Sequence, residues 1–289
     1  MATTRRTFLR SVAPGTLGAA VWSAGAKKPS GLRIGVMDTS MRLAGKPEAV
    51  ALARDLGFEG IQISIGRQGA DGRLRLADHD LQARYLAEAS KHKVRLASTY
   101  LDILHVNCLK NDPLAKKWVL EGIEITRRLR AEILMIVFFG KCSLNTPEET
   151  DTTAGFLKEL TPTAQKVGVV LGFENTLSAQ DNIRVLERVG SEALKVFYDV
   201  GNATNLGGFD APAEIRLLKR NRICQFHFKD KRYMGEGRVD FPAVIRAIAE
   251  IGFRGFAVLE TSSPSGSVSE DLRRNLAYTR RVLGEISSN

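Results

Sequence analysis

Four side chains of types that commonly bind divalent metal ions lie in the second half of this chain, each at or near the end of its own apolar run. They are Glu174 in VVLGFEN, Asp199 in KVFYDVGN, His227 in ICQFHFKD and Glu260 in FAVLET. Runs rich in Val, Ile, Leu and Phe that end in Gly or polar residues are typical of buried parallel strands. Because parallel strands of one sheet end at the same edge, the four side chains are expected to converge. Two Glu, one Asp and one His around one point would form a divalent-cation site.

The elements that must position these residues alternate regularly along the chain. The expected strands are 32–36, 60–65, 94–99, 133–138, 169–174, 194–199, 223–228 and 255–261. The expected helices are 46–56, 80–92, 113–130, 147–167, 182–189, 212–219, 241–251 and 267–286. Eight strand–helix pairs in about 255 residues predict a single (β/α)8 TIM barrel. A doubly wound sheet is the alternative, but it usually has fewer units, and no G-x-G-x-x-G turn follows the first strand.

The composition excludes several classes of protein. The chain has 289 residues and a formal net charge of +10, but its Lys and Arg are interleaved with acids along the helices, which favours a solvated basic surface over a nucleic-acid interface. No apolar stretch approaches the roughly 20 residues needed to span a bilayer. Cys108, Cys142 and Cys224 are an odd number of cysteines without metal-like spacing, so no disulfide framework is expected.

The N-terminus has the three-part order of an export signal. The basic segment TRRTFLR precedes the weakly apolar segment SVAPGTLGAAVWSAGA, and Ala24 and Ala26 form an A-x-A-like cleavage site. The Arg5-Arg6 pair, followed by Phe8, resembles a twin-arginine signal. We therefore expect residues 1–26 to be a signal peptide that engages the twin-arginine export machinery, and residues 27–289 to form a barrel domain in the periplasm or otherwise outside the cytoplasm. A disordered basic tail is the alternative.

The chemistry of the four strand-end residues favours a hard metal ion and proton transfer. Three carboxylates and one imidazole suit Mn²⁺, Mg²⁺ or Co²⁺ better than an ion selected by thiolates, and Zn²⁺ also fits. A bound ion could polarise a substrate carbonyl and stabilise an enediolate. Glu174 and Glu260, on opposite sides of a substrate, could then remove and return a proton on the neighbouring carbon. Asp199 and His227 would mainly hold the ion.

The motifs FEN, DVGN, HFKD with a following GEGRVDF, and LET resemble the sugar phosphate isomerase/epimerase family of xylose isomerase-like TIM barrels. The resemblance covers essentially the whole chain after the signal. In the ketose 3-epimerases of that family, strand-end Glu, Asp, His and Glu bind Mn²⁺ or a similar ion, and the first and last Glu exchange the proton. The resemblance therefore implies a metal-dependent sugar isomerase or epimerase, with Mn²⁺ as the expected ion and the four residues above as its ligands.

The resemblance also indicates which residues contact the substrate. The epimerases carry a basic residue in the loop after the metal-binding His, where this chain has Lys231 and Arg232, and Lys229 lies closer to that His. Two positions depart from the pattern. Many relatives have a His three residues after the metal-binding Asp, where this chain has Asn202, and a Glu shortly after the first ligand, where NTLSAQDN offers Gln180.

The sequence leaves alternatives open for the roles of three candidate residues and for the reaction. His105, after the third strand, is a candidate to face the substrate, with a simple loop His as the alternative. An exposed basic turn is the alternative for Lys231 and Arg232. Proton abstraction beside a carbonyl also serves a lyase that eliminates from a keto-sugar or keto-glycoside, as in inosose dehydration. A sugar-binding barrel that keeps the metal without catalysis is a further alternative.

The substrate is expected to be a small carbohydrate, and an export signal with no phosphate-binding Gly-rich loop favours an unphosphorylated one. No nucleic-acid partner and no membrane span are expected, and assembly into a homo-oligomer stays open.

Overall fold

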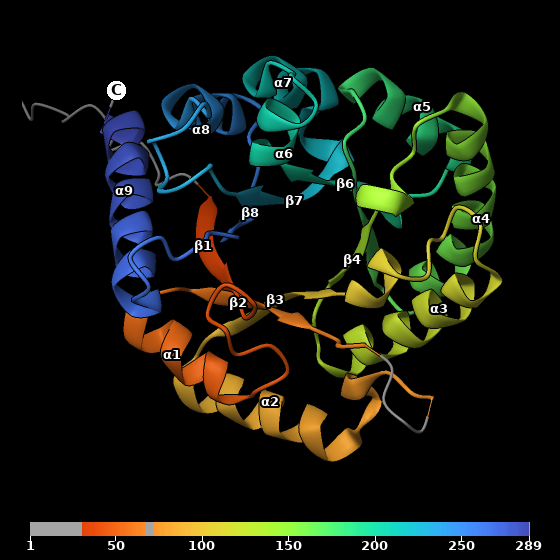
Figure 1. Ribbon diagram of the computed structural model, residues 1–289, viewed down its shortest axis with the longest axis horizontal. Helices are drawn as coiled ribbons and strands as arrows, with labels where there is room; N and C mark the ends of the chain where they lie inside the picture. The colour runs from red at the N-terminus through yellow and green to blue at the C-terminus, as the bar shows by residue number, and fades with distance from the viewer. Residues whose placement is uncertain (1–30, 68–71, 289) are drawn as a thin grey trace, which may run out of the picture.

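Eight parallel strands form a closed barrel in this computed structural model, which describes residues 31–67 and 72–288 (Figure 1). Each strand pairs with the next one along the chain, and the last strand closes the ring against the first. The strands are β1 (Leu32–Met37), β2 (Gly60–Ser64), β3 (Arg95–Tyr100), β4 (Ile133–Val137), β5 (Val170–Glu174), β6 (Leu194–Asp199), β7 (Ile223–Phe228) and β8 (Gly255–Leu259). The predicted (β/α)8 barrel is confirmed.

Helices surround the barrel and cover its outer face (Figure 1). They are α1 (Glu48–Leu56), α2 (His79–His92), α3 (Pro113–Arg128), α4 (Pro147–Lys166), α5 (Ala179–Val189), α6 (Val200–Asn205), α7 (Ala211–Arg222), α8 (Phe241–Glu250) and α9 (Val268–Ser288). The loops after β2, β3 and β4 also contain the short 3-10 helices η1 (Arg75–Ala77), η2 (Asp102–His105) and η3 (Gly140–Cys142). The strands therefore all end at one rim, where these loops build the mouth of the barrel.

Local signals in the sequence set several helix ends. The side chains of Asp112 and Thr146 accept hydrogen bonds from backbone N–H groups in the first turns of α3 and α4, each of which also begins with Pro. Gly57 ends α1 with a φ of 94°, a left-handed conformation that glycine adopts without strain. Helix α5 starts at Ala179, earlier than expected, because Ser178 caps it. Helix α6 was not expected at all.

The alternation along β7 sends His227 into the barrel. The ring centroid of Phe226 lies 4.9 Å from that of Phe253, and the ring centroid of Phe228 lies 5.4 Å from that of Phe241 at the start of α8. Both phenylalanines thus pack toward the helical layer. Because successive side chains of a strand point to opposite faces, the His between them points to the barrel interior, where it is fully buried.

A disulfide joins Cys108 to Cys142, so the expectation of no disulfide framework is wrong for this pair. The two cysteines are 34 residues apart in the sequence, in the loops after β3 and β4. They become neighbours only because β3 and β4 are adjacent in the barrel. Cys224 in β7 is a free thiol. The disulfide therefore ties together two of the loops that form the mouth.

Candidate metal centre and active site

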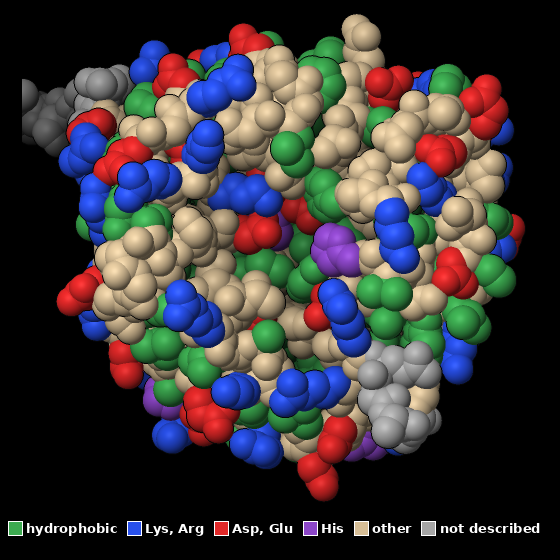
Figure 2. Space-filling model, in the orientation of Figure 1, with side chains coloured by type: hydrophobic (Ala, Val, Ile, Leu, Met, Phe, Trp, Pro, Cys, Tyr) green, Lys and Arg blue, Asp and Glu red, His purple; other side chains and the backbone are tan. Residues whose placement is uncertain are grey.

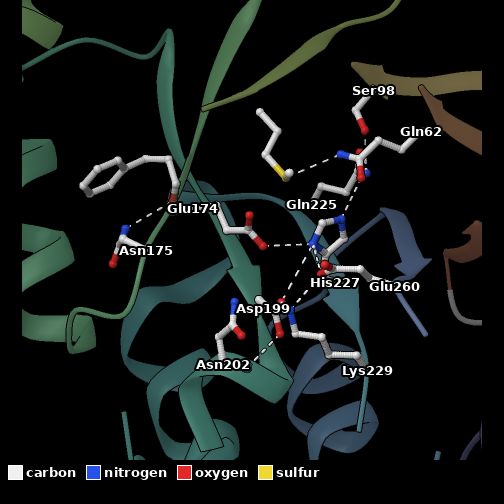
Figure 3. A network of polar contacts seen from close by, with 12 residues as sticks. Gln62, Ser98, Glu174, Asn175, Asp199, Asn202, Gln225, His227, Lys229 and Glu260 are labelled. Atoms are coloured by element: carbon white, nitrogen blue, oxygen red, sulfur yellow. Dashed lines mark hydrogen bonds and ion pairs between the residues drawn. The ribbon is translucent and has the colours of Figure 1, made fainter. Parts of the chain in front are cut away.

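The four strand-end residues meet at the mouth of the barrel (Figure 3). One ligand atom from each of them can be chosen so that all four atoms lie within 4.8 Å of one another. His227 Nδ1 lies 2.9 Å from Glu174 Oε1 and 3.1 Å from Glu260 Oε2. Asp199 Oδ2 lies 3.9 Å from the same nitrogen. One imidazole nitrogen and three carboxylates thus face one point, as the sequence predicted.

Asp199 holds its place because it also caps a helix. Its Oδ1 accepts a hydrogen bond of 2.9 Å from the backbone N–H of Asn202 in the first turn of α6, while its Oδ2 faces the cluster. A carboxylate at the end of a strand often either caps the next helix or binds an ion. This carboxylate caps the helix with one oxygen, and its second oxygen faces the cluster.

Burial and mutual charge shape the ionisation of the cluster. Burial raises the pKa of Asp199 to about 7, although Lys229 opposes that rise. Burial alone would lower the pKa of His227, but the charges of Glu174 and Glu260 raise it to about 10. Against the effect of burial, His227 and Lys229 hold the pKa of Glu260 below its usual range. The carboxylates outnumber the cations among them, which is an environment that a divalent cation would stabilise.

Lys229 lies inside this cluster instead of beside it. Its Nζ is 2.7 Å from Asp199 Oδ2 and 2.9 Å from Glu260 Oε2 (Figure 3). Burial alone would lower the pKa of Lys229, but these two carboxylates raise it, so the side chain stays an ammonium. It partly neutralises the ligand set while it also borders the cavity above it.

Gln62 in β2 is a site residue that was not predicted from the sequence. It is fully buried, and its Oε1 lies 2.7 Å from His227 Nε2. The other end of this amide, Gln62 Nε2, lies 3.5 Å from Met135 Sδ. Because an amide oxygen can only accept a hydrogen bond, His227 Nε2 carries a proton in this orientation. A metal ion would displace the proton on Nδ1, and this nitrogen, which faces the three carboxylates, would then be the metal ligand while Nε2 stays bonded to Gln62. A polar residue inside an otherwise apolar strand, GIQIS, was the signal in the sequence.

Replacing Gln62 with Leu is expected to lower the affinity for Mn²⁺ by about 10–100-fold, because the imidazole loses the partner that fixes its orientation. Isothermal titration calorimetry would measure this. Gln62→Glu retains an acceptor oxygen and should recover part of the affinity. Gln82→Leu is the matched control, because Gln82 is also buried but donates to Leu76 O, away from the cluster. Unchanged affinity in Gln62→Leu would show that Gln62 does not orient the ligand.

A cavity of about 250 Å³ lies over the cluster. Figure 2 shows the molecule hollowed near its centre, with acidic, basic and histidine side chains around the hollow. Some of the lining is apolar or aromatic and some polar; it consists of Met37, Tyr100, His105, Met135, Phe139, Glu174, Asn202, Leu206, Lys229 and Glu260. Polar groups at the base and apolar groups on the walls are the usual composition of a small-molecule site.

The structure separates the residues predicted to contact the substrate into two groups. His105, Asn202 and Lys229 border the cavity. Lys231 and Arg232 are exposed in the loop after β7 and do not border it. Gln180 is exposed in the first turn of α5 and does not border it either. Tyr100 and Phe139, which were not predicted from the sequence, face His105, with ring centroids 6.0 and 6.4 Å from that of the imidazole.

A family model described as xylose isomerase-like TIM barrel matches residues 50–282. The chain belongs to this family. The resemblance noted in the sequence is thereby confirmed. A 2-epi-5-epi-valiolone 7-phosphate 2-epimerase from Actinoplanes sp. is 27% identical over 200 residues, which cover 68% of this chain and 72% of that protein.

Solved structures of similar fold include several sugar epimerases. An L-ribulose 3-epimerase matches with a TM-score of 0.73 and 19% identity, over 89% of this chain and 96% of that one. A D-psicose 3-epimerase matches with a TM-score of 0.74 and 14% identity, over 87% and 99% of the two chains. A 3-keto-D-glucoside 4-epimerase from E. coli matches with a TM-score of 0.71 and 14% identity, over 86% and 99%. All of these proteins are epimerases by name, and epimerases are the enzyme class expected from the sequence.

The predicted export signal, residues 1–26, lies outside the described residues. Across the described part of the chain, no helix combines the length and the apolar character that a membrane crossing requires.

Proposed function

We propose that this protein is a metal-dependent epimerase or isomerase of an unphosphorylated keto-sugar. The observation that carries the proposal is the convergence of Glu174, Asp199, His227 and Glu260 beneath a cavity of about 250 Å³. The donor set consists of carboxylate oxygens and one imidazole nitrogen, which suits Mn²⁺, with Mg²⁺, Co²⁺ and Zn²⁺ as alternatives. A bound ion would supply Lewis-acid polarisation of the substrate carbonyl.

Glu174 and Glu260 are positioned to move the proton. They reach the cluster from β5 and β8, on either side of the two strands that carry Asp199 and His227. One carboxylate removes the proton from the carbon next to the carbonyl; the C–H electron pair forms the C=C bond of an enediolate, and the carbonyl electrons move to oxygen. The other carboxylate returns a proton to the opposite face, which inverts that carbon.

The walls of the cavity support a sugar without a phosphate group. Among the described residues, Lys229 is the one Lys or Arg that borders the cavity, and it is already held by Asp199 and Glu260. A phosphate would need free cationic or backbone N–H donors. We therefore expect this substrate to differ from the 7-phosphate named for the Actinoplanes relative. Tyr100 and Phe139 instead offer aromatic surface to a sugar ring.

Elimination is the second candidate reaction, because one further side chain of the cavity could serve it. His105 borders the cavity with no hydrogen-bond partner among the described residues, and burial lowers its pKa, which keeps the imidazole neutral. A neutral imidazole can give or take a proton on a sugar hydroxyl or on a leaving group. From a keto-glycoside, the same enediolate could expel the aglycone.

Export from the cytoplasm remains part of the proposal. The disulfide between Cys108 and Cys142 supports it, since disulfides form and persist mainly in oxidising compartments such as the periplasm.

Removing the metal tests the proposal. Protein treated with a chelator and dialysed should lose turnover on a panel of free keto-sugars and 3-keto-glycosides, and Mn²⁺ or Co²⁺ should restore it. A metal present at 100 times its Kd should also stabilise the fold by about 2.7 kcal/mol, read as a higher melting temperature. An intact epimer as product indicates epimerisation, whereas a released aglycone indicates elimination. Equal turnover with and without metal would contradict the proposal.

A further inference from the structure

The end of the barrel opposite the mouth is strongly basic. Two hollows, of about 760 Å³ and 580 Å³, lie where the strands begin. Four Lys or Arg and one Glu line the first hollow: Lys195, Lys219, Arg220, Arg254 and Glu132. Five Arg or Lys and one Glu line the second: Arg33, Arg54, Lys93, Arg95, Arg280 and Glu59. The carboxylates of the candidate metal centre lie at the other end of the barrel, in the mouth.

Some of these cations have local structural roles and others do not. Arg95 pairs with Glu132, Arg33 lies over the ring of Phe256, and Arg280 donates to Gly57 O. Within the described residues, the side chains of Arg54, Lys93, Lys219 and Arg254 have no hydrogen-bond or ion-pair partner. We call these four the basic-end set.

Helix ends do not account for the whole basic-end set. The helix dipole favours a cation at the C-terminal end of a helix, and Arg54, Lys93 and Lys219 lie at such ends. Arg254 lies in the turn before β8, outside any helix. Lys219 has a φ of 61° and a ψ of 168°, a backbone conformation that costs a residue with a Cβ atom on the order of 1–3 kcal/mol. Strained residues are enriched where a side chain is held for a ligand.

The chain also enters the barrel at this end. Gly31 directly precedes β1, and the Cγ of Arg254 lies 2.6 Å from where a Cβ atom on Gly31 would be. Arg254 of the basic-end set therefore lies against the residue that leads into β1.

We propose that the basic end docks on an anionic phospholipid surface, which leaves the mouth open to solvent. A planar array of phosphate groups fits cations spread over two open hollows better than one small anion does, since a single phosphate would occupy only one of them. Each Lys or Arg near such a surface strengthens binding by about fivefold. Because the attraction is electrostatic, it weakens as salt shortens the Debye length.

Vesicle co-sedimentation tests the docking. The full chain is compared with a quadruple variant of the basic-end set, Arg54→Gln, Lys93→Gln, Lys219→Gln and Arg254→Gln. The control replaces four exposed cations elsewhere, Lys46→Gln, Lys117→Gln, Lys158→Gln and Arg238→Gln, and so removes the same charge. Residues 1–30 are identical in all three proteins. Melting temperature and turnover check that each variant is folded, because the basic end lies away from the candidate active site.

The expected result is binding to vesicles with one third phosphatidylglycerol but not to pure phosphatidylcholine. The basic-end variant should bind more than about 100-fold more weakly, and the control should stay close to wild type. Raising salt from about 0.1 M to about 0.5 M should release the protein. Equal binding to both vesicles, or equal losses in both variants, would overturn the proposal. A different result would also overturn the proposal: pyrophosphate raises the melting temperature, this rise requires Lys219 and Arg254, and the protein does not bind vesicles. The hollow would then hold a small phosphate ligand.

Discussion

Replacing Glu174 or Glu260 with Gln is expected to lower turnover by about 10²–10⁴-fold, the usual contribution of a positioned acid or base. An amide keeps an oxygen that can contact a cation, but it cannot accept the substrate proton at neutral pH. Each variant should retain slow exchange of the substrate proton with solvent, in one epimer only, because the other glutamate still serves that face. Substrate binding, measured by calorimetry on metal-loaded protein, should remain detectable in both variants.

A matched control separates this effect from a general loss of charge. Glu270→Gln changes an exposed carboxyl in the first turn of α9 and should leave turnover unchanged. If Glu174→Gln and Glu260→Gln both kept more than a tenth of the wild-type turnover, neither carboxylate would be the proton carrier. If the wild type showed no proton exchange, and the wild type and both variants bound substrate equally well, the non-catalytic binding barrel would be favoured.

The second large effect is expected at the disulfide of the mouth. Replacing Cys108 and Cys142 with Ser removes a cross-link that closes 34 residues, which should cost about 3–4 kcal/mol of unfolding free energy and lower the melting temperature by roughly 10 °C. The linked loops also carry His105 and Phe139, which border the cavity. Their loosening should raise KM more than it lowers kcat.

The controls for the disulfide use the third cysteine and a reductant. Cys224→Ser removes a thiol that forms no disulfide, and it should leave KM unchanged. Dithiothreitol should lower the melting temperature of the wild type to that of the double variant and should not affect the double variant. A wild-type melting temperature that does not respond to the reductant would contradict the structural role given to this bond.

The barrel and the cluster of four candidate metal ligands could be predicted because both depend on patterns that are local in the sequence. Alternating apolar runs and helical segments defined the eight units, and the position of each polar residue at a strand end was enough to bring Glu174, Asp199, His227 and Glu260 together. The alternation of Phe226, His227 and Phe228 along β7 explains why His227 faces the interior.

The parts that could not be predicted depend on contacts between segments far apart in the chain. Gln62 is 165 residues from His227, so nothing near either residue indicates their hydrogen bond. Cys108 and Cys142 become neighbours only when β3 and β4 pair. Helix α6 has a Gly and two Asn among its six residues, a composition with weak helix propensity, and it forms where Asp199 caps it.

Deuterium incorporation is the measurement that tests the central claim most directly. Metal-reconstituted protein is incubated with candidate keto-sugars in D₂O, and the carbon next to the carbonyl is followed by NMR. The proposed proton transfer predicts that deuterium appears at this carbon in the recovered sugar, that the label depends on added Mn²⁺ or Co²⁺, and that it accompanies inversion. Inversion without any solvent deuterium, or label that appears equally in chelator-treated protein, would contradict the proposal that the carboxylates of a metal centre carry the proton.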